Sequence, residues 1–231
     1  SCAFPPGFET NSYAGTPTEL PYPDDHARFL RHGYYASISF VDAQVGMLLE
    51  ELDRLGLREN TIIVVWSDHG WKLGEHNAWA KHTNVEDDTR VPVILSAPGM
   101  ANAGQASERL VELVDIFSTL ADLAGLPIPE HVEGTSFKPL FEDPTRPWKS
   151  AAFSQYPRGK LMGYSIRTER YRYTRWLERK NPKKVTAVEL YDHQQDPQEN
   201  VNVAKDPHYA KTVNLLDQQL TEGWKAAKPT S

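Results

Sequence analysis

The chain has 231 residues, of which 39% are hydrophobic and 10% aromatic, and this content is enough to bury a globular core. Its net charge of −6 argues against a nucleic-acid partner or an anionic membrane surface. No apolar run is long enough to span a bilayer, and the single cysteine, Cys2, excludes an internal disulfide.

The first third of the sequence predicts an extended segment, a long helix and a buried strand. Residues 1–25 are rich in Pro, Gly, Thr and Ser without periodicity, which is typical of an extended surface segment. Over residues 26–55 apolar side chains recur at alternating steps of four and three, so we expect one helix whose apolar face packs on a sheet. Residues 61–66 are an unbroken β-branched and aromatic run, the pattern of a central strand buried on both faces in a parallel sheet.

Ionisable residues follow this strand directly. Asp68 and His69 come where the strand ends, which is the edge at which open α/β sheets bind ligands. A carboxylate beside an imidazole, followed by a glycine, is half of a plausible divalent-metal site. On these three residues alone, a turn that carries a capping carboxylate is the more common interpretation, and the loop that follows favours the metal site. The polar loop over residues 71–82 adds aromatic and basic side chains and almost no aliphatic ones, and such a long connection is more often functional than idle.

The middle of the chain predicts shorter elements. Residues 89–96 read as a second strand with Pro92 near its start, and 110–114 as a further short strand. Asp115 has the position of an N-cap for a helix that ends near Gly125. Residues 127–149 are rich in proline and read as a loop.

The C-terminal third predicts an antiparallel meander followed by a helix. Short aromatic or β-branched runs occupy 153–156, 161–168, 171–176 and 188–191, and an amphipathic pattern over 207–227 predicts a helix packed on that sheet. The alternation of Arg and Tyr from 170 to 175 predicts one packed and one solvated face. Ten basic residues lie between 158 and 184, which either face an anionic polysaccharide or line a solvated strand.

Several of these segments together resemble the formylglycine-dependent sulfatases. Residues 67–71, 73–76, 79–81 and 90–94 are similar to the second metal-and-sulfate segment of that family. The resemblance continues in consistent order to about residue 204, and within the family it is strongest to the branch that removes the 2-sulfate of iduronate, a glycosaminoglycan sugar. It implies an alkaline-phosphatase-like α/β fold with a mixed or parallel sheet between helices. Residues 26–146 would be the C-terminal part of that domain, and 147–231 a small α+β subdomain.

The resemblance also implies roles for six residues. Asp68 and His69 match two calcium ligands, and Lys81 matches the lysine whose ammonium contacts the sulfate oxygens. Trp71, Trp79 and His82 are candidates for the sugar pocket, although His82 departs from the aromatic residue expected after the lysine. The formylglycine nucleophile and the remaining ligands are expected in an N-terminal half that is not part of these residues, so we expect this piece alone to be inactive.

Cys2 does not fit the formylglycine motif, because Phe4 and Pro6 stand where Pro or Ala and then Arg are required. The sequence leaves three alternatives open: a phosphatase or phosphonate hydrolase of the same superfamily, a non-catalytic carbohydrate-binding or scaffold module, and a structural remnant. By resemblance the compartment would be exported, periplasmic or lysosomal.

Overall fold

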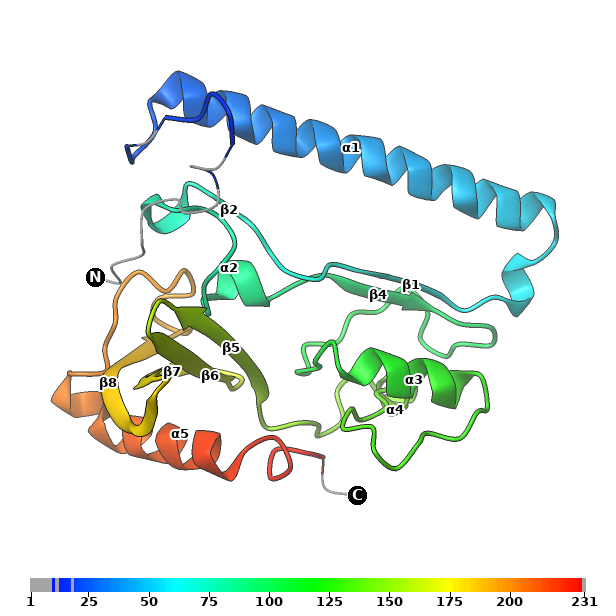
Figure 1. Cartoon of the computed structure of the whole chain (residues 1–231). Helices are drawn as coiled ribbons and strands as arrows, with labels where there is room; N and C mark the ends of the chain where they lie inside the picture. The colour runs from blue at the N-terminus through cyan, green and yellow to red at the C-terminus, as the bar shows by residue number, and fades with distance from the viewer. Residues whose placement is uncertain (1–9, 11–12, 18, 230–231) are drawn as a thin grey trace. The chain divides into compact units, whose positions relative to one another are not determined.

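The computed structural model describes residues 10, 13–17 and 19–229, and Figure 1 labels its helices and strands. They group into two compact units, which are described separately. One unit contains the described residues up to Lys81 together with Val91–Gly99. The other contains His82–Arg90 together with the described residues from Met100 onward. Cys2 and about half of the predicted extended segment lie outside the described residues, and the boundary predicted after residue 146 stays a prediction.

The long helix of the first unit, α1, spans Asp24–Arg54 and confirms the helix predicted over 26–55 (Figure 1). Gly56 follows it in the left-handed conformation, with φ of 66°, as is common just after a helix end. The apolar stripe, however, stays largely exposed, with Ile38 at 50% and Leu48 at 68%. The expected packing of this face on a sheet is therefore not found among the described residues.

Strand β1 (Ile63–Trp66) pairs with β4 (Val93–Ser96). The strand predicted over 61–66 is confirmed, but its pairing is antiparallel rather than parallel, and Trp66 is 50% exposed rather than buried. An apolar run favours strand conformation, whereas the direction of pairing depends on the segment that lies beside it, which the run does not encode. Pro92 immediately precedes β4, as expected of a residue without an N–H.

Four short elements connect β1 to its surroundings: η2 (Arg58–Asn60), β2 (Lys72–Leu73), η3 (Glu75–Asn77) and β3 (Trp79–Ala80). β2 and β3 form a small antiparallel ladder. The polar loop predicted after β1 is therefore folded back on itself and pinned by backbone hydrogen bonds.

The second unit begins with α2 (Glu86–Thr89) and continues with α3 (Asp115–Leu123) and α4 (Pro139–Glu142). The helix predicted after residue 115 is confirmed by α3. The strand predicted over 110–114 is wrong, because these residues join no strand pairing in the described part of the chain.

Asp115 was predicted to cap α3, and this role is wrong. The residue is the first of the helix and its side chain is fully buried, with the ammonium of Lys149 at 2.8 Å from its carboxylate. The carboxylate also accepts hydrogen bonds from the backbone N–H groups of Glu112 and Thr135. A buried charge needs such partners, and they draw Asp115 into the interior instead of onto the helix end.

A four-stranded antiparallel meander confirms the sheet predicted for the C-terminal third (Figure 1). Its strands are β5 (Ala152–Arg158), β6 (Leu161–Arg167), β7 (Tyr171–Glu178) and β8 (Asn181–Asp192). Helix α5 (Ala210–Glu222), which follows η4 (Pro207–Tyr209), covers one face and confirms the predicted packing. Ile166, Tyr173 and Leu190 of the sheet form a buried core with Leu216 of the helix.

The other face of this sheet was predicted to be solvated, and at Arg172 this prediction is wrong. Arg172 is only 2% exposed. The start of α2 and the loop after β8 bring Glu86 and Glu199 onto the guanidinium. A strand's alternation shows which residues share a face, but not whether a distant segment covers it.

Candidate functional site

The turn that follows β1 presents the first two candidate residues. The backbone N–H of Ser67 donates to the Pro92 carbonyl at 3.4 Å, and its hydroxyl donates to the His69 carbonyl at 2.6 Å. These two bonds tie the end of β1 to β4 and bend the chain immediately afterwards. Asp68 and His69 are thereby held at the end of a strand, as the sequence predicted.

Asp68 and His69 face one another in a geometry suited to a shared cation. Asp68 Oδ2 lies 3.5 Å from His69 Nε2, and the Asp68 side chain is 82% exposed. His69 Nδ1 lies 2.8 Å from the Gly70 carbonyl oxygen, which can only accept, so we assign the imidazole proton to Nδ1. In the neutral imidazole Nε2 then carries a lone pair, and this atom lies 3.5 Å from a carboxylate oxygen. A cation or an added proton between the two atoms would stabilise this arrangement.

The donor set fits part of a divalent-cation site. A carboxylate oxygen and an imidazole nitrogen are both common ligands, and the hydrogen bond to Gly70 orients the imidazole as metal-binding histidines usually are. Calcium takes six to eight oxygen ligands, so this pair supplies only a fraction of a site. Within the described ranges, no third His, Cys, Asp or Glu joins the pair.

An aromatic and a lysine extend this pair. The Trp71 ring stacks near the His69 ring, with centroids 6.3 Å apart and planes inclined by 29°. Lys81 Nζ lies 5.3 Å from the centroid of the same indole, and Tyr34 of α1 stacks near it at 6.3 Å. The structure therefore links four of the six predicted residues: His69 and Lys81 lie near the Trp71 indole, and Asp68 lies beside His69.

The other two predicted residues pack elsewhere. Trp79 is 6% exposed and packs on Tyr22, with ring centroids 5.5 Å apart, so it offers little surface to a sugar. His82 belongs to the second compact unit, where its ring lies 5.4 Å from that of Tyr156 on β5. The structure does not join either residue to the Asp68–His69 pair.

The loop that carries Lys81 is held in an unusual backbone conformation. Four non-glycine residues between 76 and 82 have positive φ: His76 at 56°, Asn77 at 54°, Ala80 at 66° and His82 at 86°. Each such residue costs of order 1 kcal/mol or more, and this cost is tolerated only where surrounding contacts impose the shape. Strained backbone of this kind clusters at functional sites, which supports a functional role for the loop.

Arg31 of α1 is a positioning residue that the sequence reasoning missed. Its Nε donates to the Leu73 carbonyl at 2.9 Å, and its guanidinium lies 5.5 Å above the Trp79 ring. A Cβ added at Gly74 would approach its Nη2 to 2.7 Å, so only glycine fits there without displacing it. In the sequence Arg31 looks like an ordinary exposed residue on a helix, and only the fold shows that it braces the loop.

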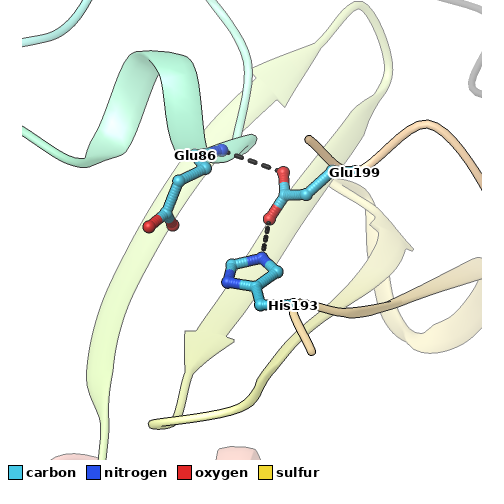
Figure 2. A group of neighbouring side chains, drawn as sticks. All are labelled: Glu86, His193 and Glu199. Atoms are coloured by element: carbon cyan, nitrogen blue, oxygen red, sulfur yellow. Dashed lines mark hydrogen bonds and ion pairs between the residues drawn. The ribbon is translucent and has the colours of Figure 1, made fainter. Parts of the chain in front are cut away.

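A second group of potential metal ligands lies in the other unit and was also missed. Figure 2 shows Glu86, His193 and Glu199, whose ligand atoms all lie within 4.8 Å of one another. His193 Nε2 lies 2.7 Å from Glu199 Oε1, and the Glu86 backbone N–H donates to Glu199 Oε2 at 2.9 Å. The three residues come from segments that are more than a hundred positions apart at the extremes, so sequence spacing gives no signal for them.

Two arginines already satisfy this cluster. Arg172 Nε donates to Glu199 Oε1 at 2.6 Å, its Nη2 reaches Glu86, and Arg167 Nε donates to Glu86 Oε2 at 3.1 Å. Two guanidiniums balance two carboxylates, so a divalent cation would have to displace them. Burial alone raises the pKa of Glu86, but Arg172 and Arg167 outweigh it and hold that pKa below its ordinary value. We interpret the cluster as a buried ion-pair network and not as a metal centre.

Comparisons with known proteins agree in finding similarity to sulfatases. Residues 5–126 match the model of the sulfatase family, and residues 74–226 match that of the C-terminal part of N-sulphoglucosamine sulphohydrolase. Iduronate 2-sulfatase of Mus musculus is 37% identical over 262 residues, covering 85% of this chain and 48% of that protein.

Solved structures extend the similarity to the fold. A protein bound to its substrate D-glucosamine-2-N,6-O-disulfate has a TM-score of 0.76 and 32% identity, covering 85% of this chain and 41% of that one. Phosphonate monoester hydrolase of Agrobacterium radiobacter has a TM-score of 0.80 and 26% identity, covering 93% and 45%. The predicted alkaline-phosphatase-like fold class is thereby confirmed. The chain spans about half the length of the relatives that it matches.

Proposed function

Because this chain belongs to the sulfatase family, we propose that it forms part of an enzyme that hydrolyses the sulfate ester of a sulfated sugar. The preferred substrate in this proposal resembles iduronate 2-sulfate, which the 37% identity to iduronate 2-sulfatase supports. The single observation that carries the proposal is that His69 and Lys81 both lie near the Trp71 indole, with Asp68 beside His69.

The chemistry of a sulfate ester explains why these residue types suit it. When the ester bond breaks, negative charge grows on the sulfate oxygens and on the departing sugar oxygen, and fixed positive charge stabilises both. Asp68 and His69 would hold a calcium ion, which supplies a Lewis-acidic positive charge to the sulfate when bound. Lys81 would place its compact ammonium on a sulfate oxygen, and the Trp71 face would pack against the sugar ring.

The nucleophile would come from a residue outside this chain. Cys2 is the only cysteine, it lies outside the described residues, and the residues after it do not match the formylglycine motif. We therefore propose that a hydrated formylglycine in another segment of the complete enzyme would supply the nucleophilic oxygen, and that the 231 residues alone do not turn over.

Exposed apolar surface supports the need for this second segment. Phe29 is 71% exposed and Phe40 68% on α1, and Ile94 is 64% exposed on β4. Large apolar side chains exposed together along one helix usually mark a surface that another protein segment covers. The segment that corresponds to the other half of the relatives is the partner that we propose for this surface.

A phosphonate or phosphate ester hydrolase is the second candidate function, and the similarity to phosphonate monoester hydrolase favours it. Both reactions need a cation and convergent donors around a tetrahedral anion, so the residues named above do not separate them. A non-catalytic carbohydrate-binding module is the third alternative, and it predicts sugar binding without hydrolysis.

One experiment distinguishes the three. The complete protein is assayed with matched aryl sulfate, aryl phosphate and phosphonate esters, after chelation and after return of calcium, zinc or manganese. We expect sulfate ester hydrolysis that chelation removes and calcium restores. Preference for phosphonate with zinc or manganese would favour the second candidate, and the absence of any hydrolysis would contradict the proposal.

A further inference from the structure

Residues 158–184 carry ten basic and two acidic side chains, in a chain whose total is 25 basic and 31 acidic. Arg158, at the end of β5, lies over the Trp176 ring. The structure divides the other nine into two groups. Four arginines of β6 and β7 and the turn between them bind carboxylates within the unit: Arg167 with Glu86, Arg170 with Asp192, Arg172 with Glu199 and Arg175 with Asp217. These four charges are neutralised internally, so they offer nothing to a partner.

Five other cations gather at one end of the sheet. Lys160 lies in the turn between β5 and β6, Arg179 and Lys180 form the turn between β7 and β8, and Lys183 and Lys184 follow in a bulge at the start of β8. All five are exposed. We call these five residues the basic end of the sheet.

Backbone pairing keeps the two turns side by side. Leu161 at the start of β6 pairs with Glu178 at the end of β7, and the Arg179 N–H donates to the Lys160 carbonyl at 2.9 Å. The pairing register of β8 then jumps, which pushes Lys183 and Lys184 out of the ladder beside the turn. The cations are therefore presented on a hydrogen-bonded scaffold, which lowers the ordering cost of binding.

This group is under-neutralised. Among the described residues one carboxylate pairs with it, that of Glu178, whose Oε1 lies 2.6 Å from Lys184 Nζ. Five cations against one carboxylate, in a chain with a net charge of −6, form a local positive surface on an otherwise acidic protein. Such a surface attracts a polyanion locally, while the remaining charge repels large anionic surfaces such as a duplex or a membrane.

We propose that the basic end binds a sulfated polysaccharide, through residues that take no part in the proposed hydrolysis. Sulfate groups spaced along a flexible chain can each meet one lysine or arginine. A rigid duplex or a flat bilayer would also be repelled by the net negative charge of the rest of the chain. The choice of a sulfated polymer rests on the proposed function, but the cluster itself rests only on the sheet geometry. The surface would retain a long substrate between successive cleavages.

The test uses heparin as the probe and the complete protein. The variant Lys180→Glu/Lys183→Glu reverses two charges at the basic end, and Lys211→Glu/Lys225→Glu reverses two exposed charges elsewhere in the same unit. We expect the first to weaken the heparin Kd by about tenfold or more and to lower the slope of log affinity against log salt by about two, since fewer counterions are released. The second should retain most of the wild-type affinity. Equal affinities of the two variants would overturn the proposal.

Three further probes identify the partner. Hyaluronan carries carboxylates without sulfates, and duplex DNA and phosphatidylserine vesicles carry phosphates. We expect heparin to bind at least about tenfold more tightly than each, a difference set by how many cations each probe can meet. A probe that binds as tightly as heparin and loses affinity in the Lys180→Glu/Lys183→Glu variant would overturn the assignment to a sulfated sugar.

The same variants test heparin binding by the basic end separately from the proposed hydrolysis. Hydrolysis of a small aryl sulfate should be unchanged in both, because none of the four substituted lysines belongs to the group proposed to act on the sulfate ester. If hydrolysis is found but charge reversal leaves heparin affinity intact, only the docking inference fails. If heparin binds through the basic end but no ester is hydrolysed, only the proposed function fails.

Discussion

Charged side chains gather in two regions of this chain, and their surroundings differ. Around Glu199, two carboxylates, two guanidiniums and an imidazole are buried or mostly buried and paired with one another. After β1, the Asp68 carboxylate is 82% exposed and lies near an imidazole nitrogen, and Lys81 lies over an indole. A network whose hydrogen-bonding capacity is used internally stabilises the fold. Asp68 is instead exposed, and His69 and Lys81 are half-buried, with side-chain types that can bind metals and anions.

The largest effect is expected from breaking the buried network. Arg172→Met removes the guanidinium that joins Glu86 to Glu199 and leaves both buried carboxylates short of a partner. We expect the free energy of unfolding to fall by ~3–5 kcal/mol. Urea unfolding of the variant and the wild type measures this difference.

The matched control is a solvent-exposed arginine, Arg90, that pairs with the same Glu86 carboxylate. Arg90 lies 3.8 Å from Glu86 Oε1, but its side chain is 73% exposed. Arg90→Met should cost less than about 1 kcal/mol, since exposed ion pairs contribute little. Equal losses of unfolding free energy in Arg172→Met and Arg90→Met would show that burial does not determine how much each ion pair contributes to stability.

Substitution of the exposed Asp68 should have the opposite effect, a loss of activity with little loss of stability. Asp68→Asn removes a proposed calcium ligand from an exposed turn, so sulfate ester kcat/KM should fall about a hundredfold or more while stability changes by less than ~0.5 kcal/mol. Kinetics over a calcium titration, with thermal unfolding in parallel, measures both. Asp42→Asn on α1 is the control with the same chemical change. Full activity of the Asp68 variant in chelator would contradict a metal role.

A smaller effect is expected from acid. The Arg172 and Arg167 charges outweigh burial and hold the Glu86 pKa below its ordinary value of 4.5. A carboxylate with a lowered folded-state pKa adds stability that is fully present above the unfolded value and disappears as pH falls through the folded value. The variant Glu86→Gln lacks this contribution at every pH. Its free energy of unfolding, measured between pH 7 and pH 3, should therefore decline less steeply below about pH 4.5 than that of the wild type. An unchanged acid limb would contradict the role of this carboxylate.

The smallest effect is expected at the basic end. Lys184 is 59% exposed and pairs with Glu178 at 2.6 Å. Lys184→Ala should change the free energy of unfolding by less than about 0.5 kcal/mol, because solvent screens the pair. Chemical denaturation resolves such a difference, and a loss comparable to that of Arg172→Met would show that this pair is structural.

Local patterns predicted the local elements of this chain. The 3.6-residue periodicity over α1 and α5 and the alternation over β5 to β8 each depend on neighbouring residues, and all these elements are present. Asp68 and His69 were placed correctly at a strand end because an apolar run followed by polar residues marks that boundary. The metal and sulfate roles came from family resemblance and stay predictions.

What the sequence did not show depends on distant partners. Arg172 looked solvated because Glu86, 86 residues earlier, is invisible in a strand pattern. Trp79 looked exposed in a polar loop, but it packs with Tyr22, which precedes α1, and with Ala27 in its first turn. In each case burial was decided by a segment whose position only the tertiary fold sets.

The most direct test of the account is the effect of Lys81→Met on sulfate ester kcat/KM and on unfolding in the complete protein. We expect kcat/KM to fall at least about a hundredfold, because the ammonium that is proposed to contact the sulfate oxygens is lost. Stability should change by less than ~1 kcal/mol, because the Lys81 side chain is only half-buried. Turnover at the wild-type rate would contradict the central claim that this loop serves sulfate chemistry.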